Sequence, residues 1–202
     1  NANHPNIRLF DVPGHTVHPL PQSKGNGNWK VCTPATIPSF SATGYYFGRR
    51  LQKELNVPIG LIGANLGGTR IEPWTTLDGF KTVPELSDQA KSVAAYTKDT
   101  KVGGGTPSAI YNSMVHPLTP YAMREAIWYQ GESNGNEGIT YYQKKRALVK
   151  GWREAFQNPN RGVYGVQRCN WKQPGKTPGV GGGWAAQVRQ HLVLLREGRG
   201  PG

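Results

Sequence analysis

The residues best suited to chemistry lie at the end of the sequence AIWYQGESN, residues 126–134. This stretch begins as an apolar, aromatic run and changes at Gln130 into polar and turn-forming residues. A short apolar run bounded by turn residues predicts a buried strand, and in an α/β sheet the loop leaving the carboxyl end of such a strand is where ligands bind. The alternative is that Glu132, Ser133 and Asn134 only form a turn and cap the next helix.

A second group of candidate residues follows the apolar run IGLIGA at residues 59–64. Gly67 and Gly68 would let the backbone come close to a ligand and direct N–H groups at it, although a tight turn is the simpler reading. Arg70 and Glu72 follow closely enough to line the same cleft, and the Arg70 guanidinium suits bidentate binding of a carboxylate. A surface ion pair between these two residues is the alternative.

A third polar group lies within an otherwise apolar stretch, PSAIYNSMVHPLTP at residues 107–120. Tyr111 and Asn112 are candidate ligand contacts. We expect His116 to be structural, because a lone histidine among apolar residues usually packs or forms a hydrogen bond instead of acting as a base.

The elements that must position these residues follow from the hydrophobic pattern. Alternating or continuous apolar runs predict strands, and apolar residues at helical spacing predict amphipathic helices. The predicted strands are residues 7–12, 59–64 and 126–129, and the predicted helices are residues 41–55, with Ser41 as N-cap, and 141–156. Helices that alternate with buried strands indicate an α/β fold, here a three-layer α/β/α sandwich with a mainly parallel sheet.

The remaining segments read as connections. Residues 13–38 are rich in proline and turn residues, which predicts a long surface connection with little regular structure. Residues 75–105 read as a covering insertion with a polar helix at 84–98. No clear strand is predicted after residue 158.

Composition limits the function classes. A chain of 202 residues suits one domain with a proper core. The net charge of +12 is concentrated after residue 143, where 12 Lys and Arg face only 2 Asp and Glu. No nucleic-acid-binding signature accompanies this charge, so no specific nucleic-acid partner is expected. The basic residues of the last predicted helix fit a solvated face: Lys144, Lys145, Arg146, Lys150 and Arg153.

Cysteine count and apolar runs exclude two further classes. Cys32 and Cys169 are too few for a zinc cluster of thiolates, and their spacing does not show whether they pair. No run of 18 apolar residues occurs, so no membrane-spanning helix is expected. The chain starts without Met and without the apolar stretch of a signal peptide, so we expect a processed or partial product.

Four segments together resemble the sialate O-acetylesterase family of carbohydrate esterases, which belongs to the SGNH hydrolases. Their order and spacing agree with that family, and the match covers about residues 7–157. The segments are VPIGLIGANLGGTRIEPWT at 57–75, PSAIYNSMVHPLTPYAMREAIWYQGESN at 107–134, the helix ending in Gly151-Trp152-Arg153, and Trp171-Lys172-Gln173-Pro174.

This resemblance implies hydrolysis of acetyl esters on sugars such as sialic acid, by a serine nucleophile with an Asp-His pair and donors for the oxyanion. By match, the donors are the Gly68 N–H and the Gln130 amide. The implied substrate contacts, on an O-acetylated carbohydrate, are Gly67, Arg70, Glu72, Tyr111, Asn112, Glu132, Ser133 and Asn134. Ser133 is not the expected nucleophile. No metal or organic cofactor is implied.

The sequence departs from the family at both ends. The family nucleophile lies in a Gly-Gln-Ser-Asn sequence, which does not occur here, and the last aspartate is Asp99, so no C-terminal Asp-x-x-His sequence exists. We therefore expect residues 1–157 to be a partial domain, incomplete at both ends and without esterase activity. Residues 158–202 are expected to be a basic, Gly-rich tail, produced by a frameshift or by divergence.

A non-catalytic carbohydrate-binding or interaction module on the same fold is the alternative function. Aromatic side chains offer stacking faces for sugar rings, and the candidates are Trp74, Tyr111, Trp128 and Tyr129. The residues themselves assign neither compartment nor oligomeric state. Family members are commonly exported, which implies a secreted or periplasmic location.

Overall fold

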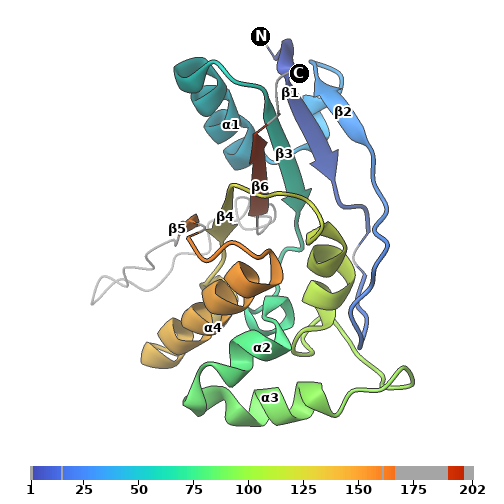
Figure 1. Cartoon of the computed structure of the whole chain (residues 1–202), viewed down its shortest axis with the longest axis vertical. Coiled ribbons are helices and arrows are strands. Elements are labelled where there is room, and N and C mark those ends of the chain that lie inside the picture. The colour runs from blue at the N-terminus through green and yellow to red at the C-terminus, as the bar shows by residue number, and fades with distance from the viewer. Residues whose placement is uncertain (1, 15, 161, 167–190, 198–202) are drawn as a thin grey trace, which may run out of the picture.

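The computed structural model describes residues 2–14, 16–160, 162–166 and 191–197, which form a six-stranded sheet in the order β2-β1-β3-β6-β4-β5 (Figure 1). The strands are β1 (His4–Asp11), β2 (Trp29–Cys32), β3 (Ile59–Ala64), β4 (Glu125–Tyr129), β5 (Gly162–Val166) and β6 (His191–Glu197). The pairs β1–β3 and β4–β5 are parallel. The pairs β1–β2, β3–β6 and β4–β6 are antiparallel. The chain is therefore α/β as predicted, but the sheet formed by the described strands is mixed, and the expected mainly parallel sheet is not observed.

Alternate residues of the strands face two separate apolar clusters, because successive side chains of a strand point to opposite faces. Leu9 and Leu61 pack with Tyr45 of α1 (Ala42–Leu55) on one face. Ile62 and Trp128 belong to the cluster on the other face, which also contains Leu148 and Trp152 of α4 (Ile139–Ala155). Helices therefore cover both faces of the sheet.

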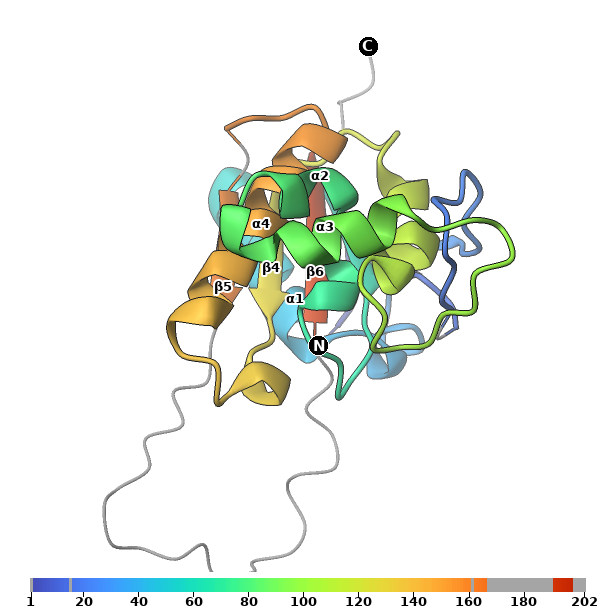
Figure 2. The same ribbon diagram turned by 90° about the horizontal axis from the view of Figure 1, so that it is seen from below.

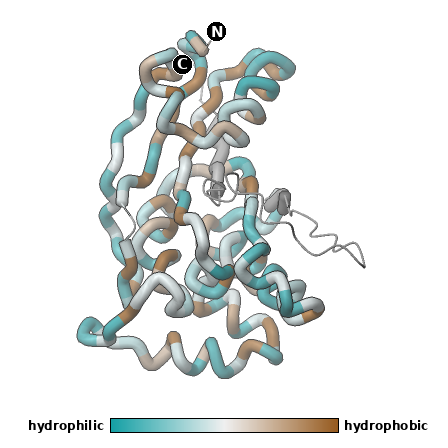
Figure 3. Tube along the Cα trace, turned by 180° about the vertical axis from the view of Figure 1, so that it is seen from behind, coloured by the Kyte–Doolittle hydropathy of each residue, from teal (hydrophilic) through white to brown (hydrophobic). Residues whose placement is uncertain are grey.

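Helix α1 begins where the sequence predicts. The Ser41 hydroxyl accepts a hydrogen bond from the Gly44 N–H at 3.1 Å, which satisfies one of the free N–H groups of the first turn. The outer turns of α1, at the upper right in Figure 3, are coloured as hydrophilic, and the helix is amphipathic as expected.

Two short helices, α2 (Leu77–Lys81) and α3 (Ser87–Ala94), lie beyond the end of the sheet toward which β1 and β3 point (Figures 1 and 2). Phe80, Leu86 and Val93 form a third cluster there with Ala147 of α4. Single turns of 3-10 helix are η1 (Ile37–Ser39), η2 (Glu72–Trp74), η3 (Pro84–Leu86), η5 (His116–Leu118) and η6 (Glu132–Asn134), and η4 (Tyr111–Val115) is a π-helix.

The predictions about the two irregular segments have different outcomes. The proline-rich connection at 13–38 has little regular structure, as expected, although it contains the four-residue strand β2, which pairs with β1 at the edge of the sheet. The prediction of no clear strand after residue 158 is wrong. The segment after residue 158 contains β5 and β6, and both pair with β4. These strands are stabilised by partners far away in the chain, and their glycine- and arginine-rich surroundings hide the local strand pattern.

The described residues also bear on the cysteine and membrane expectations. Cys32 is a buried free thiol, and burial raises its pKa. Cys169 lies outside the described residues. Within the part of the chain that the structure describes, no helix has both the length and the apolar character needed to cross a bilayer.

Candidate active site

The loops that carry the two predicted oxyanion donors leave the sheet at the same end of the strands. β3 and β4 both run antiparallel to β6, which lies between them, so their carboxyl ends point the same way. The loop after β3 carries Gly68 and the loop after β4 begins at Gln130. The Gln130 side chain bridges the loops by donating a hydrogen bond from Nε2 to the Thr69 backbone oxygen at 3.2 Å. The loops are thus in contact although their strands are not adjacent.

Gln130 lies inside a hydrogen-bond network, with only 1% of its surface exposed. Besides Thr69, its Nε2 donates to Oδ1 of Asn134 at 2.8 Å. The Tyr141 hydroxyl lies 3.0 Å from Oε1 of Gln130 and 2.9 Å from its backbone oxygen, so it donates to one of these acceptors. Both amide N–H groups of Gln130 are therefore committed to protein acceptors in this structure.

Asn134 extends this network to the residues after the glycines. Its Oδ1 also accepts from the Ile71 backbone N–H at 3.0 Å, and its Nδ2 donates to Oε2 of Glu72 at 3.2 Å. The side chain is buried, so these bonds form away from bulk water. Asn134 therefore fixes the β4 loop against the β3 loop.

Four charged side chains complete the network. Nζ of Lys144 lies 2.6 Å from Oε1 of Glu72 and 2.7 Å from Oε2 of Glu137. The half-exposed Arg70 pairs with both carboxylates, at 3.2 Å from Oε1 of Glu72 and in closer contact with Glu137. The expected surface pair of Arg70 and Glu72 is therefore part of a larger, partly buried cluster. Glu137 is a member that the sequence did not identify.

The prediction that Lys144 lies on a solvated helix face is wrong, because its side chain is only 7% exposed. Lys144 follows Tyr141 by three residues and precedes Leu148 by four, and both of these face inward. Helical spacing therefore places Lys144 on the side of α4 that faces the sheet. There the negative charges of Glu72 and Glu137 compensate its buried ammonium, which would be unfavourable without a partner.

The network controls the ionisation of Glu72. Burial acts on this carboxyl most strongly and would raise its pKa. Hydrogen bonds from Lys144, from the backbone of Glu72 itself, from Asn134 and from Arg70 together outweigh burial, and the pKa of Glu72 lies below its ordinary value. Glu72 is thus a carboxylate at neutral pH.

Gly68 presents an open backbone beside this network. Its φ of +75° lies in the left-handed region, and nothing lies within 4 Å of the position a Cβ would take. None of the described residues accepts a hydrogen bond from the Gly68 N–H. The neighbouring Thr69 is held by contacts of its hydroxyl with the Leu66 backbone oxygen and with Nε1 of Trp74, both at 2.9 Å. The turn is therefore fixed while Gly68 stays accessible.

The remaining predicted site residues divide between two places. Glu132 is exposed and Ser133 half-buried on η6, next to Asn134, and Gly67 is exposed beside Gly68. Tyr111 and Asn112 instead lie on η4, and the side-chain amide of Asn112 donates to the segment before β2 and not to the Gln130 network.

Asn112 and His116 act as structural residues. Nδ2 of Asn112 donates to the backbone oxygens of Pro19 at 2.7 Å and His18 at 3.2 Å. Nδ1 of His116 lies 2.8 Å from the backbone oxygen of Gln22, which confirms the expectation for this histidine. Both side chains hold the segment before β2 against η4.

Two of the four proposed stacking faces for sugar rings are inaccessible. Trp74 is 1% and Trp128 3% exposed, and their rings pack edge to face with centroids 5.7 Å apart. The prediction that they stack on sugars is wrong, because both indoles fill the core behind the two loops.

Residues 35–177 match the family model described as carbohydrate esterase, sialic acid-specific acetylesterase. The chain belongs to this family. The matched range contains both loops and all four charged residues of the network.

Individual members of the carbohydrate esterase family agree with this assignment. The chain is 33% identical over 147 residues to the sialate O-acetylesterase of Homo sapiens, covering 71% of this chain and 25% of that protein. It is 30% identical over 167 residues to the sialate O-acetylesterase of Rattus norvegicus, covering 71% of this chain and 29% of that protein. The chain thus spans between a quarter and a third of the length of these relatives.

A solved structure has a similar overall fold. The crystal structure of a carbohydrate acetylesterase from Xanthomonas citri superposes with a TM-score of 0.68 at 30% identity. The superposition covers 82% of this chain and 34% of that one. The fold of this chain is thus the fold of part of a carbohydrate esterase.

Proposed function

We propose that this chain supplies the oxyanion-binding and sugar-binding side of a carbohydrate O-acetylesterase site. The observation that carries the proposal is the hydrogen-bonded contact between the Gly68 loop and the Gln130 loop. The contact lies at the carboxyl ends of β3 and β4 and within the family-matched residues. Attack on an acetyl ester produces a tetrahedral oxyanion, and fixed N–H donors lower the energy of that state.

In this proposal, the Gly68 N–H is the first donor to the oxyanion, because it is free and its turn is fixed. The Gln130 amide is the second donor. It becomes available by giving up its longer bond, to the Thr69 oxygen at 3.2 Å, while the 2.8 Å bond to Asn134 keeps the side chain oriented. Catalytic hydrogen bonds often tighten only when substrate is present, so the free structure does not oppose this role.

The proposed substrate is an O-acetylated acidic sugar of the sialic acid type. Arg70 supports this choice, because its guanidinium is half exposed and suits a carboxylate. Glu72 and Glu137 orient the guanidinium, and the neighbouring Glu132 and Ser133 are proposed to meet sugar hydroxyls.

The nucleophile and the Asp-His pair are proposed to be missing from this chain, since neither sequence motif occurs in it. Without them, acetyl transfer to a serine and its return to water do not proceed at an enzymatic rate. We further infer that the complete domain is a three-layer α/β/α sandwich, and that residues 1–157 form part of it. The helices on both faces of the sheet support this inference.

A non-catalytic carbohydrate-binding module is the second candidate, favoured by the same missing motifs. Acetate release and calorimetric binding, measured with acetylated and de-acetylated sialic acid, separate the two candidates. We expect saturable binding of the acetylated sugar with little or no acetate release, and weaker binding by an Arg70→Gln variant. Arg49→Gln on α1 is the control and should bind as the parent chain does. Turnover like that of an intact esterase would refute the missing nucleophile, and unchanged binding by Arg70→Gln would refute the carboxylate contact.

A further inference from the structure

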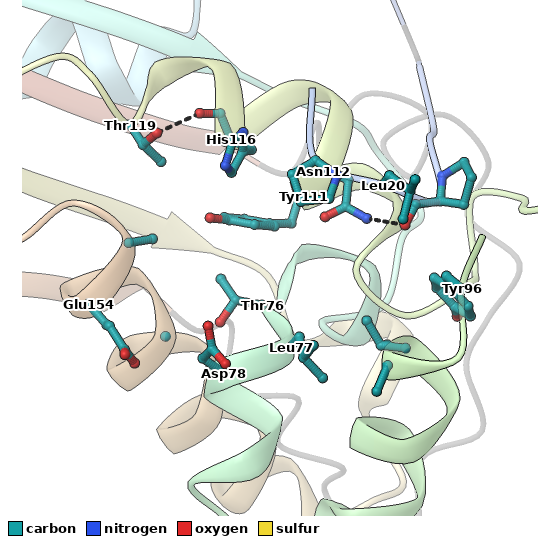
Figure 4. Close-up of a pocket in the computed structure, with 16 residues that line it drawn as sticks. Leu20, Thr76, Leu77, Asp78, Tyr96, Tyr111, Asn112, His116, Thr119 and Glu154 are labelled. Carbon is teal, nitrogen blue, oxygen red and sulfur yellow. Dashed lines mark hydrogen bonds between the residues drawn. The ribbon is translucent and has the colours of Figure 1, made fainter. Parts of the chain in front are cut away.

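A pocket of about 420 Å³ is lined by residues other than those of the Gly68 and Gln130 loops. Its walls are the segment Pro19–Pro21, η4, the start of α2, the end of α3 and the last turns of α4 (Figure 4). None of Gly68, Gln130 or the charged residues of their network lines it. The volume falls in the range of sites for small molecules.

The Tyr111 side chain reaches into this pocket. The residue is only 5% exposed, and its hydroxyl points into the space between η4 and α2 (Figure 4). Among the described residues, none forms a hydrogen bond with this hydroxyl. The hydroxyl faces the pocket, so water or a ligand there can act as its hydrogen-bond partner.

The lining combines acceptors with apolar and aromatic surface and contains no Lys or Arg. Asp78 and Glu154 place carboxylates at the pocket, and Tyr96 adds a second ring. An anionic ligand would be repelled by both carboxylates. The charge of Asp78 is already offset by Lys81, at 2.9 Å, which weakens the attraction for a cation.

We propose that this pocket is a subsite for an uncharged pyranose unit. Hydroxyls of a neutral sugar can donate to Asp78 and Glu154 and pair with the Tyr111 hydroxyl, while the sugar's C–H faces cover Tyr96 and Leu77. The inference rests on the proposed function in one respect: such a unit would be the neutral neighbour of the acidic sugar in a glycan. Sugar specificity then extends beyond the acetylated residue.

Further support comes from the ionisation of Tyr111. Burial, followed by the negative charge of Asp78, raises the pKa of this phenol. The hydroxyl therefore remains a donor throughout the neutral range.

The test is a titration of the 202-residue chain with methyl β-galactoside and methyl β-glucoside, followed by calorimetry and by NMR shifts of the pocket residues. We expect weak, saturable binding of at least one glycoside that does not change with salt. Tyr111→Phe removes one hydroxyl and should weaken binding about three- to tenfold. Tyr142→Phe, on the exposed face of α4, is the matched control and should have no effect.

Several results would overturn the subsite. The first is a lack of saturable binding of either glycoside at millimolar concentrations. The second is equal binding by Tyr111→Phe and the parent chain. The third is tighter binding of the cation butylammonium than of either glycoside, with that binding abolished by salt, which would indicate a cation site. A thermal unfolding profile of Tyr111→Phe like that of the parent shows that a loss of binding is not a loss of fold. The glycoside probes carry neither an acetyl group nor a carboxylate. A negative result with them therefore does not bear on the proposed site at Gly68, and a negative result at the Gly68 site does not bear on the pyranose subsite.

Discussion

Replacing Lys144 with methionine should destabilise the fold far more than its place in a charged helix suggests. The ammonium lies 2.6 Å from Glu72 and 2.7 Å from Glu137, and all three side chains are largely buried. Methionine keeps most of the volume and removes the charge. Among the residues that the structure describes, the half-exposed Arg70 is then the one cation left to compensate two carboxylates.

The expected loss follows from burial. Exposed ion pairs contribute about 0–1 kcal/mol, whereas removing one partner of a buried pair costs about 3–5 kcal/mol, because the other charge stays unpaired. Domains of this size are stable by about 5–15 kcal/mol, so Lys144→Met should remove a large part of the free energy of unfolding. Lys145→Met makes the same change one residue along α4 and should cost no more than about 0.5 kcal/mol.

The loss should also depend on pH in a defined direction. The folded-state pKa of Glu72 is lowered, so its stabilising effect is complete above the unfolded pKa of about 4.3 and is lost as pH falls through the folded pKa. Without Lys144, burial dominates and the pKa of Glu72 rises. The difference between the parent and Lys144→Met should therefore be large at pH 7 and shrink below about pH 4.

Urea denaturation followed by tryptophan fluorescence, at neutral and at acidic pH, measures these differences for the parent and both variants. Equal midpoints for Lys144→Met and Lys145→Met at pH 7 would refute the buried network. A difference that keeps its pH 7 value well below pH 4, for example at pH 3, would refute the role of Glu72 in it.

Three further predictions follow from other contacts. Gly151→Ala places a Cβ 2.0 Å from Oγ1 of Thr76 and should cost about 1–3 kcal/mol in urea denaturation. Gly104→Ala, where nothing lies within 4 Å, should cost no stability, and equal effects of the two would contradict the tight crossing of α2 and α4. Ser41→Ala should lower the free energy of unfolding by about 1 kcal/mol through loss of the N-cap, and an unchanged value would show that the cap bond contributes nothing. Burial raises the folded-state pKa of Tyr111, so its contribution to stability is complete below the unfolded pKa of about 10 and declines as pH rises from there through the folded pKa. Tyr111→Phe should therefore make thermal stability less sensitive to alkaline pH, and an identical profile would argue against this.

Features set by local pattern could be predicted from the sequence. The Ser41 cap, the helix that follows it, and the apolar strands β3 and β4 depend on residues within one or two turns of each other, and all four are present in the structure. The same holds for α4, whose apolar stripe faces the core. The two polar loops could be located because they directly follow β3 and β4.

Features set by distant partners could not be predicted. The buried Lys144 ammonium is compensated by Glu72, 72 residues earlier, as well as by Glu137. The indole rings of Trp74 on η2 and Trp128 on β4 pack against each other, which shields both rings from solvent. β6 inserts between β3 and β4, which no pattern within either strand indicates. The sequence therefore identified the polar residues of the Gln130 loop. Which of them are buried in the hydrogen-bond network and which stay accessible depends on tertiary contacts.

The central claim is that the Gly68 loop and the Gln130 loop form the oxyanion-binding side of an ester site. The most direct test is the NMR shift of the Gly68 backbone amide and the Gln130 side-chain amide during titration with O-acetylated sialic acid. We predict saturable shifts of both signals, larger than those produced by sialic acid without the acetyl group. Shifts confined to other residues, or equal shifts with and without the acetyl group, would contradict the claim.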